Sequence, residues 1–417
     1  MSDIIVRKLN SYEKTIDCPS DKSISVRAVI LSSYAVGRSV IRGLSLCDDV
    51  KTAIECMKML GAEIELDGNT AFITGAPFHS GKLYCGNSAT VARLLIGLLS
   101  GMNGIFELDG DAFLRNRPMK RVVEPLKSMG AVITDTDGRL PIKIIGSALR
   151  GMEYELPIPS AQVKSALLLA GLNASGSVTV MEKIKTRDHT EIMLKSMNGK
   201  VDMSGNEVSV TPSILYARDT EICGDVSSAA YPICLALGMR GGRVVVKNVG
   251  INKTRTKYLD FLLECGADIT FTKASEGDEP YCDVIVRGGN KLKPITVTAE
   301  DAPMVIDEIP VLCALSCFID GESVFDGLSE LRVKESDRVQ GIIDALCALG
   351  ADITEKNDRI TVRGGKALKF GTVNPNGDHR IAMSAAVAGA LGNGVCILGG
   401  ECVDISYPGF FEEVVCV

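Results

Sequence analysis

The sequence predicts an α/β (α+β) fold of two domains, built from six β-α-β-α-β-β repeats with three repeats in each domain. The chain has 417 residues, which is long for a single hydrophobic core. Its residues are 46% hydrophobic and 23% charged, which is typical of a soluble globular protein. A pattern of strand, polar cluster, Ala/Leu-rich helix and glycine also returns about every 70 residues. Three such repeats make one domain, so six predict two.

A polar cluster precedes the first helix of each repeat. The six clusters are residues 20–23, 86–90, 160–162, 224–228, 306–308 and 377–380. A glycine follows each of these helices, at Gly37, Gly104, Gly176, Gly242, Gly321 and Gly394. Since each cluster stands at a helix start, we expect six helix N-termini of similar chemistry to converge on one site.

The two ends of the chain set the expected domain boundaries. The sixth repeat stops after a second helix, expected over residues 407–415, and lacks closing strands. Residues 3–18 carry strand patterns with no repeat before them, so we expect residues 1–19 to complete the sixth repeat. The predicted domains are 20–223 and 1–19 plus 224–417. The chain then crosses twice, near residues 19 and 223, which predicts a hinge and a ligand cleft between the domains.

Composition argues against several classes of function. The net charge is −7 and no Lys/Arg run occurs, so nucleic-acid binding is not expected. No signal peptide is recognisable, and the longest apolar run, 309–319, is too short to span a bilayer, so we expect a cytoplasmic protein without membrane contact. The 14 cysteines form no C-x-x-C pair and are expected to be buried, reduced thiols. With only three histidines, no metal site is expected.

The first cluster has the features of an anion site. A strand pattern over 15–18 leads into it and an apolar helix pattern over 28–34 follows. Ser20 or Asp21 is the expected N-cap, with Lys22, Ser23 and Arg27 on the first two turns. The unpaired N–H groups and positive dipole of a helix start attract anions, and these side chains add to that attraction. The alternative is an ordinary capped helix with solvated charges.

Charged residues in the second half of the chain suggest proton chemistry. Lys334 and Arg338 are spaced i,i+4, which predicts one shared helix face with Glu335 beside them. Asp307 lies between apolar runs, either as a helix cap or as a general acid/base. Arg380 follows Asp378, which indicates either a capped helix or an arginine that pairs with a carboxylate or phosphate. A solvated, salt-bridged surface is the alternative for each stretch.

Taken together, these residues describe a pocket for two polyanions with a pair of carboxylates for proton transfer. The candidate cations are Lys22, Arg27, Arg117, Arg187, Lys334, Arg338 and Arg380. The candidate carboxylates are Asp307 and Glu335. The sequence contains neither a P-loop nor a dinucleotide fingerprint.

Six motifs in these stretches resemble those of the EPSP synthases, the 3-phosphoshikimate 1-carboxyvinyltransferases. They are Asp-Lys-Ser-x-Ser-x-Arg-Ala, Gly-Asn-Ser-x-Thr-x-x-Arg, Arg-x-Arg-Pro-Met, Ser-Ala-Gln-Val-Lys-Ser-Ala, Arg-Val-Lys-Glu-Ser-Asp-Arg and Asp-His-Arg-x-Ala-Met. They occur in the family's order, and the resemblance covers the whole chain. It implies an inverted α/β architecture with three β-α-β-α-β-β units per domain.

The resemblance also implies a reaction. Members of the family transfer the enolpyruvyl group of phosphoenolpyruvate to the 5-hydroxyl of shikimate 3-phosphate and release phosphate, on the shikimate pathway to chorismate and the aromatic amino acids. The reaction needs no metal or organic cofactor. The resemblance further leads us to expect a monomer.

Matching positions imply the substrate contacts. The residues expected to bind shikimate 3-phosphate are Lys22, Ser23, Arg27, Ser160, Ala161, Gln162, Arg187, Asp307 and Lys334. Those expected to bind phosphoenolpyruvate are Lys22, Ala89, Arg117, Gln162, Arg338 and Arg380. The expected catalytic residues are Lys22, Asp307 and Glu335. Asp307 would take the 5-hydroxyl proton, and Glu335 would deliver a proton to C3 of phosphoenolpyruvate.

Three positions depart from the common family pattern. Ala89 stands where many members have Gly, Ile405 where many have Lys, and His189 where many have Tyr. The Ile405 position puts one phosphoenolpyruvate contact in doubt. The Ala89 methyl is expected to crowd the inhibitor glyphosate, which is longer than phosphoenolpyruvate, so we expect weak inhibition.

Two other functions are weighed against this one. A UDP-N-acetylglucosamine enolpyruvyl transferase typically has Lys-Asn at the first helix start, whereas Lys22 is followed here by Ser23. Residues 113–117 also lack the Cys or Asp often found on that family's mobile loop. A non-catalytic, hinged anion-binding protein would gain nothing from carboxylates such as Asp307 and Glu335 in its pocket.

Overall fold

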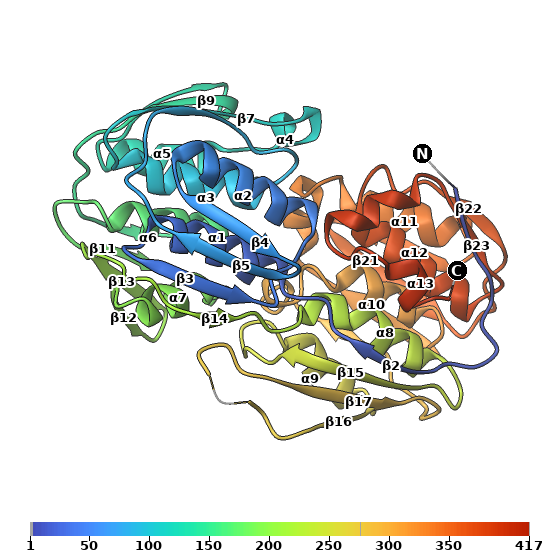
Figure 1. Cartoon of the computed structure of the whole chain (residues 1–417). Helices are drawn as coiled ribbons and strands as arrows, with labels where there is room; N and C mark the ends of the chain where they lie inside the picture. Colours follow the sequence, from blue (N-terminus) through green and yellow to red (C-terminus); the bar gives the residue numbers. More distant parts are fainter. Residues whose placement is uncertain (1–2, 276, 417) are drawn as a thin grey trace. The chain divides into compact units, whose positions relative to one another are not determined.

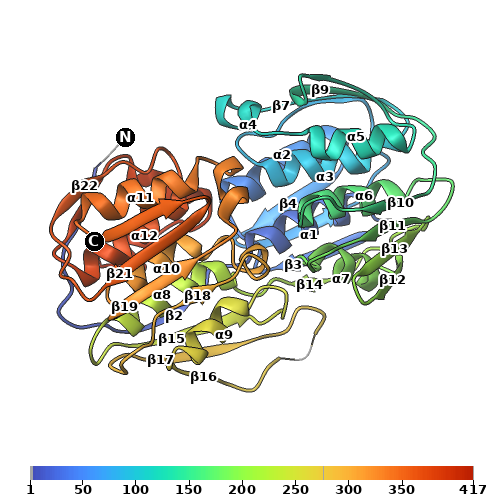
Figure 2. The same ribbon diagram turned by 180° about the vertical axis from the view of Figure 1, so that it is seen from behind.

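The computed structural model describes residues 3–275 and 277–416. These residues fold into two compact units. The first unit is Ser20–Ile222, and the second joins the residues up to Pro19 with those from Cys223 onward. Each unit contains three buried helices side by side, with small sheets around them (Figures 1 and 2). The hinge expected at the two connections stays a prediction.

The first unit contains three four-stranded sheets. Their strands, in spatial order, are β14 (Thr220–Glu221), β3 (Arg38–Arg42), β5 (Thr70–Thr74) and β4 (Glu63–Asp67); β6 (Gly81–Tyr84), β7 (Ile105–Asp109), β9 (Arg139–Ile145) and β8 (Val132–Thr136); and β10 (Met152–Glu155), β11 (Val178–Met181), β13 (Glu207–Thr211) and β12 (Lys200–Ser204). Its helices are α1 (Lys22–Tyr34), α2 (Asp48–Leu60), α3 (Ala89–Ser100), α4 (Ala112–Asn116), α5 (Lys120–Ser128), α6 (Ala161–Gly171) and α7 (His189–Ser196).

The second unit contains two four-stranded sheets and one of three strands. Their strands are β2 (Glu13–Asp17), β15 (Arg243–Gly250), β17 (Tyr281–Arg287) and β16 (Asp268–Phe271); β18 (Thr296–Val297), β19 (Gly321–Phe325), β21 (Arg359–Gly364) and β20 (Asp352–Lys356); and β1 (Ile4–Val6), β23 (Val395–Ile397) and β22 (Gly371–Val373). Its helices are α8 (Val226–Gly238), α9 (Lys257–Glu264), α10 (Ile309–Ser316), α11 (Arg338–Ala348), α12 (His379–Leu391) and α13 (Phe410–Glu413), with 3-10 turns η1 (Ala302–Met304), η2 (Leu328–Val333) and η3 (Gly400–Ile405).

The sheets repeat one topology. In each four-stranded sheet an edge strand runs parallel to its neighbour, and the remaining contacts are antiparallel. Where the parallel neighbours follow each other in the chain, as in β6/β7, β10/β11 and β18/β19, they are joined through a helix, as a parallel crossover requires. The structure thus confirms the mixed α/β class.

The strands beside the two connections are placed differently from our prediction. Only β1 joins the sixth repeat, where it pairs with β23. Strand β2 pairs instead with β15 of the fourth repeat, and β14 pairs with β3 of the first. The prediction that residues 1–19 complete the sixth repeat is therefore wrong for β2. The strand pattern predicted β2 itself, but its partner depends on chain segments more than 200 residues away.

The central helices of each unit are buried on nearly every side. In the first unit these are α1, α3 and α6, and in the second α8, α10 and α12. Their largely apolar sequences favour burial all round, which explains their central position, although each unit also buries charged side chains such as Arg27 and Arg380 in these helices. The second helices α2 and α5 instead have one buried face and one solvated face.

Two details of the prediction need correction. The expected helix over 407–415 is only α13, because Gly409 before it adopts a left-handed φ of 80°. None of the 14 cysteines, all of them in the described part of the chain, forms a disulfide, but not all are buried: Cys347 and Cys416 are exposed, and Cys18, Cys396 and Cys402 are only partly buried. Among the described residues, no helix has the length and apolarity needed to cross a membrane.

Helices α3 and α6 approach so closely that only glycine fits at one position. A Cβ on Gly97 would lie 2.1 Å from the backbone oxygen of Ala166. Alanine normally favours a helix interior over glycine by about 1 kcal/mol. Here the clash reverses the sign, and we predict that Gly97→Ala lowers the free energy of unfolding by about 1–3 kcal/mol in urea titrations.

Gly81→Ala is the matched control for this prediction. The nearest atom to a Cβ at Gly81 is the oxygen of Met59, at an ordinary contact distance of 3.7 Å. A Gly97→Ala protein as stable as the Gly81→Ala protein would contradict the packing argument.

Candidate active site

Three capped helix starts carry the candidate residues of the first unit. The Asp21 carboxylate accepts a hydrogen bond from the Ile24 N–H at 2.8 Å, so Asp21 rather than Ser20 caps α1. Ser88 caps α3, and Ser160 caps α6. These caps follow the preference for short polar side chains at the N-cap.

Lys22 lies in the first turn of α1 and is largely buried. Its ammonium forms an ion pair with Asp49 in the first turn of α2, at 3.1 Å. The side chains of Lys22 and Asp49 are 15% and 9% exposed. Asp49 was not predicted as a site residue because acidic residues are common in the first turn of a helix.

Arg27 connects three helices. Its Nε donates to Thr190 Oγ1 at 2.7 Å, and its Nη2 donates to Ser165 Oγ at 3.2 Å. Its Nη1 donates to the backbone oxygen of Ser23 at 3.0 Å. These contacts fix the buried guanidinium between α1, α6 and α7.

Gln162 is held in a similar way by α3. Its side-chain amide donates to Thr90 Oγ1 at 3.0 Å and accepts a hydrogen bond from Arg93. Arg93 also donates to the backbone oxygen of Pro118 at 2.9 Å, next to the buried Arg117. Arg93 is the arginine of the Gly-Asn-Ser-x-Thr-x-x-Arg motif, so the motif included this residue although we predicted no role for it.

The remaining first-unit candidates also lie at or near helix starts. Ala89 and Ala161 are the first residues of α3 and α6, and Ala89 is buried. Arg187 is half-buried in the loop before α7, and His189 is the first residue of that helix.

Lys164 was missed because its neighbours follow an apolar helix pattern. It is fully buried in α6 and forms ion pairs with Glu182 at 2.8 Å and Glu191 at 2.7 Å. Burial raises the pKa of Glu191, and Lys164 only partly offsets this. The signal was a lysine inside the Ser-Ala-Gln-Val-Lys-Ser-Ala motif.

Arg338 organises the site residues of the second unit. Its guanidinium is buried and donates to Asp307 at 3.1 Å, to Asp378 at 2.8 Å and to Glu335. Burial disfavours the guanidinium charge, but Asp378, Glu335 and Asp307 outweigh this, so the pKa of Arg338 lies above its ordinary value. One cation therefore brings together the two carboxylates that we singled out from the sequence.

The local conformation around Arg338 differs from our prediction. Helix α11 begins only at Arg338, with Asp337 as N-cap, and Lys334 follows η2 outside the helix. The predicted helix face shared by Lys334 and Arg338 is therefore wrong. The Asp337 carboxylate accepts from the Gln340 N–H, which is why the helix starts there.

Asp307 is not a helix cap. Helix α10 begins after Glu308, and neither carboxylate makes a side-chain cap. Asp307 instead pairs with Arg338, and Glu308 accepts a hydrogen bond from Ser227 in α8. Arg255 donates to Ser227 Oγ at 2.7 Å, which links Glu308, Ser227 and Arg255 in a buried network. An Asp-Glu pair in the sequence does not reveal which of the two carboxylates is buried.

Arg380 lies in the first turn of α12 and is buried. The Asp378 carboxylate accepts from its backbone N–H at 2.9 Å, so Asp378 caps the helix and also pairs with Arg338. Burial disfavours the Arg380 charge, but Tyr231 and Asp307 outweigh this, and the pKa of Arg380 lies above its ordinary value.

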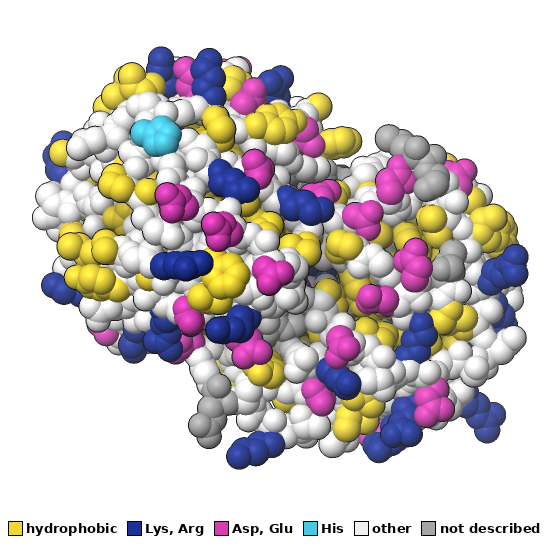
Figure 3. Space-filling view, viewed as in Figure 1, with side chains coloured by type: hydrophobic (Ala, Val, Ile, Leu, Met, Phe, Trp, Pro, Cys, Tyr) yellow, Lys and Arg dark blue, Asp and Glu magenta, His cyan; other side chains and the backbone are white. Residues whose placement is uncertain are grey.

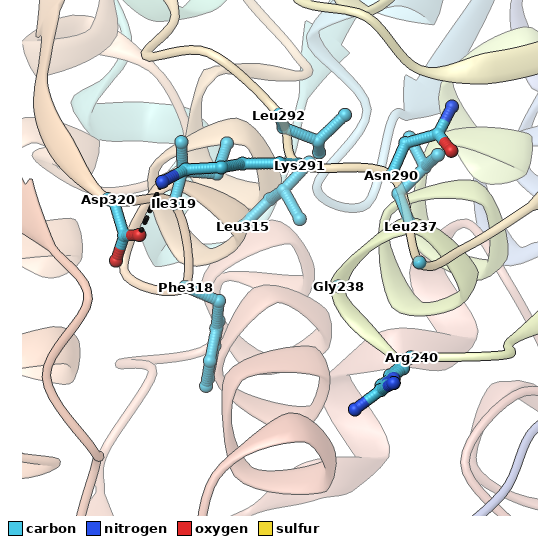
Figure 4. A pocket seen from close by; sticks show the side chains of 11 residues that line it. Leu237, Gly238, Arg240, Asn290, Lys291, Leu292, Leu315, Phe318, Ile319 and Asp320 are labelled. Atoms are coloured by element: carbon cyan, nitrogen blue, oxygen red, sulfur yellow. Dashed lines mark ion pairs between the residues drawn. The ribbon is translucent and has the colours of Figure 1, made fainter.

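Neither a cavity beside α8 and α10 nor the charges on the surface identify the candidate site. A cavity of about 230 Å³ opens where α8 and α10 end, beside the Lys291–Asp320 ion pair (Figure 4). Helix C-termini carry the negative end of the dipole, which makes this cavity a poor anion site. On the face shown in Figure 3, Lys and Arg side chains are interspersed with Asp and Glu, so buried rather than exposed charges define the candidate site.

Within 3–275 and 277–416, no cluster of His, Cys, Asp or Glu side chains could hold a metal ion.

A model of the EPSP synthase family, 3-phosphoshikimate 1-carboxyvinyltransferase, matches residues 6–414. The chain belongs to the EPSP synthase family. The 3-phosphoshikimate 1-carboxyvinyltransferase of Endomicrobium trichonymphae is 40% identical over 98% of both chains. That of Desulforudis audaxviator is 43% identical over 94% of both. The family resemblance seen in the six motifs is thereby confirmed, and the chain belongs to a family of enzymes.

Solved structures agree with the EPSP synthase family. An EPSP synthase from Acinetobacter baumannii superposes with a TM-score of 0.86 at 36% identity, over 98% of this chain and 97% of that one. The enolpyruvyl transferase NikO from Streptomyces tendae has a TM-score of 0.81 at 16% identity and shares the fold. The two-domain inverted α/β architecture is confirmed.

The raised pKa of Glu191 predicts how stability depends on pH. Between the unfolded and folded pKa values the folded state binds a proton that the unfolded state has lost, so stability falls as pH rises through this range. Lys164 pairs with Glu191 and also with Glu182, and the charge of Asp188 further raises the pKa of Glu191. Glu191→Gln keeps a neutral group at every pH. We predict that its stability relative to the unmodified protein increases from about pH 4 toward pH 7.

Urea unfolding midpoints at several pH values measure this effect. Glu207→Gln, on the exposed side of β13, is the matched control, and its difference from the unmodified protein should stay constant. A constant difference for Glu191→Gln as well would contradict the assignment.

Proposed function

We propose that this chain transfers the enolpyruvyl (carboxyvinyl) group of phosphoenolpyruvate to the 5-hydroxyl of shikimate 3-phosphate and releases phosphate. One observation carries the proposal beyond family membership: Arg338 pairs with Asp307 and Glu335 at once. A protein that only binds anions has no use for two carboxylates at this position. The paired carboxylates suit a reaction in which protons are both taken and given.

The substrates are highly charged. Each phosphate brings about −1.5 to −2 charges, so with two carboxylates the pair carries roughly −5 to −6. We propose that Ser23, Arg27, Ser160, Ala161, Gln162, Arg187, Asp307 and Lys334 hold shikimate 3-phosphate. We further propose that Ala89, Arg117, Gln162, Arg338 and Arg380 hold phosphoenolpyruvate, and that Lys22 contacts both substrates. Hydrogen bonds hold the buried guanidiniums of Arg27 and Arg338 in fixed orientations, and an oriented guanidinium suits carboxylate and phosphate groups.

The proposed reaction has two steps. Asp307 takes the proton of the 5-hydroxyl as its oxygen bonds to C2 of phosphoenolpyruvate, and Glu335 gives a proton to C3. In the second step C3 loses a proton, the double bond re-forms, and the C2–O bond to phosphate breaks. The proposal includes no metal or organic cofactor, and it retains a cytoplasmic monomer as an expectation.

Phosphate release from phosphoenolpyruvate tests the proposal. We expect release that depends on shikimate 3-phosphate, and none when UDP-N-acetylglucosamine replaces it as acceptor. Release with the sugar nucleotide alone would establish the alternative transferase. No release with either acceptor, although both substrates bind, would leave only the anion-binding protein.

Asp307→Asn tests the base. Asn keeps a hydrogen-bond acceptor for Arg338 but cannot take a proton. We predict that kcat falls by about 10²- to 10⁴-fold, while the dissociation constant of shikimate 3-phosphate measured by calorimetry changes far less. Unchanged kcat would remove Asp307 from the chemistry.

Ala89→Gly tests the proposed effect on glyphosate. We predict that removing the methyl lowers the inhibition constant roughly 10- to 100-fold, with little change in KM for phosphoenolpyruvate. Ala112→Gly, at the exposed first position of α4, is the matched control. An inhibition constant that is the same in both variants and in the parent would contradict the idea.

A further inference from the structure

Lys164 is an unusual residue for the centre of a domain. Its side chain is 0% exposed, yet it carries an ammonium group that must be paired to be tolerated there. Its partners come from two places: Glu182, just after β11, and Glu191 in the first turn of α7. A buried ion pair adds little stability over an apolar packing, so the group invites another explanation.

The partners of Lys164 bracket one loop. Residues 182–188 connect β11 to α7; Glu182 begins this connection, and Glu191 lies just beyond it in the first turn of α7. In the middle, the Thr186 backbone N–H donates to Glu182 at 3.1 Å, and the Thr186 hydroxyl also donates to this carboxylate. Lys164 Nζ lies 3.4 Å from the backbone oxygen of Thr186. A single ammonium therefore contacts the beginning and middle of the loop and the first turn of the helix that follows it.

The fixed loop presents Arg187. Arg187 directly follows Thr186, so the backbone position of Arg187 is set by the contacts of Lys164 and Glu182. A separate anchor lies on the other side, where Thr190 Oγ1 hydrogen-bonds Ser165 Oγ at 2.7 Å and accepts from Arg27. Loss of Lys164 would thus free the part of the loop that carries Arg187 while Thr190 stays held.

We propose that Lys164 is a positioning residue that holds Arg187 in place to bind the phosphate of shikimate 3-phosphate. This inference rests on the proposed function and deepens it, because it assigns a second residue to the recognition of that phosphate. Lys164 itself is enclosed and does not touch the substrate. It acts through Glu182 and the backbone of Thr186.

A double-mutant cycle tests the inference. Arg187→Ala is expected to raise KM for shikimate 3-phosphate by about 10- to 100-fold, as for the loss of a charged hydrogen bond. Lys164→Met should raise the same KM, with little change in KM for phosphoenolpyruvate or in kcat. If Lys164 acts through Arg187, the double variant should be no worse than Arg187→Ala alone. If Lys164 acts independently of Arg187, the effects of the two substitutions on this KM should instead add in full.

Two further variants complete the experiment. Glu182→Gln weakens the contacts of residue 182 with Lys164 and Thr186 but keeps a side chain of similar size. It should raise KM for shikimate 3-phosphate even if Lys164→Met fails to fold. Lys195→Met, on the exposed side of α7, is the control and should change nothing. Independent, additive effects of Lys164→Met and Arg187→Ala, or equal rises in both KM values, would overturn the inference. An unmodified protein that lacks the transferase activity would instead defeat the proposed function itself.

Discussion

The burial of Arg338 is the constraint on which the candidate site depends. A guanidinium removed from water must be paired, and leaving one partner of such a group alone costs about 3–5 kcal/mol. Arg338 meets this requirement with Asp307 before α10, Glu335 before α11 and Asp378 at the start of α12. Three segments of the chain are thereby held around one cation, and two of them carry the carboxylates proposed for proton transfer.

The first unit follows the same principle with other partners. Arg27 bonds to hydroxyl and carbonyl oxygens of α1, α6 and α7, which orient its guanidinium. Arg93 orients Gln162, and Lys164 fixes the loop before α7. In both units, buried cations on helices give the functional side chains a fixed geometry. Fixed geometry at polar sites is what substrate recognition and catalysis require.

The sequence predicted the features that depend on local signals. An N-cap at Ser20 or Asp21, the repeat pattern and the largely apolar central helices each follow from residues close together in the chain. Predictions that depend on contacts between distant segments were wrong or absent. Strand β2 pairs in the fourth repeat rather than the sixth, and the ion pairs of Lys164 with Glu182 and Glu191 were not predicted. The prediction that Lys334 lies on a helix was wrong for a different reason. Asp337 caps α11 and starts the helix after Lys334, although the i,i+4 spacing of Lys334 and Arg338 suggested a shared helix face. Arg255 gave no signal because its partners lie on other elements, and the Asp-Glu pair did not show that Glu308 is the more deeply buried carboxylate.

A crystal structure with shikimate 3-phosphate would show whether the buried cations and helix starts form the substrate site. We expect its phosphate within hydrogen-bonding distance of Ser23 and Arg187, at the starts of α1 and α7. Substrate bound instead in the cavity beside Lys291, where α8 and α10 end, or density at neither place under saturating conditions, would show that these residues do not form the site.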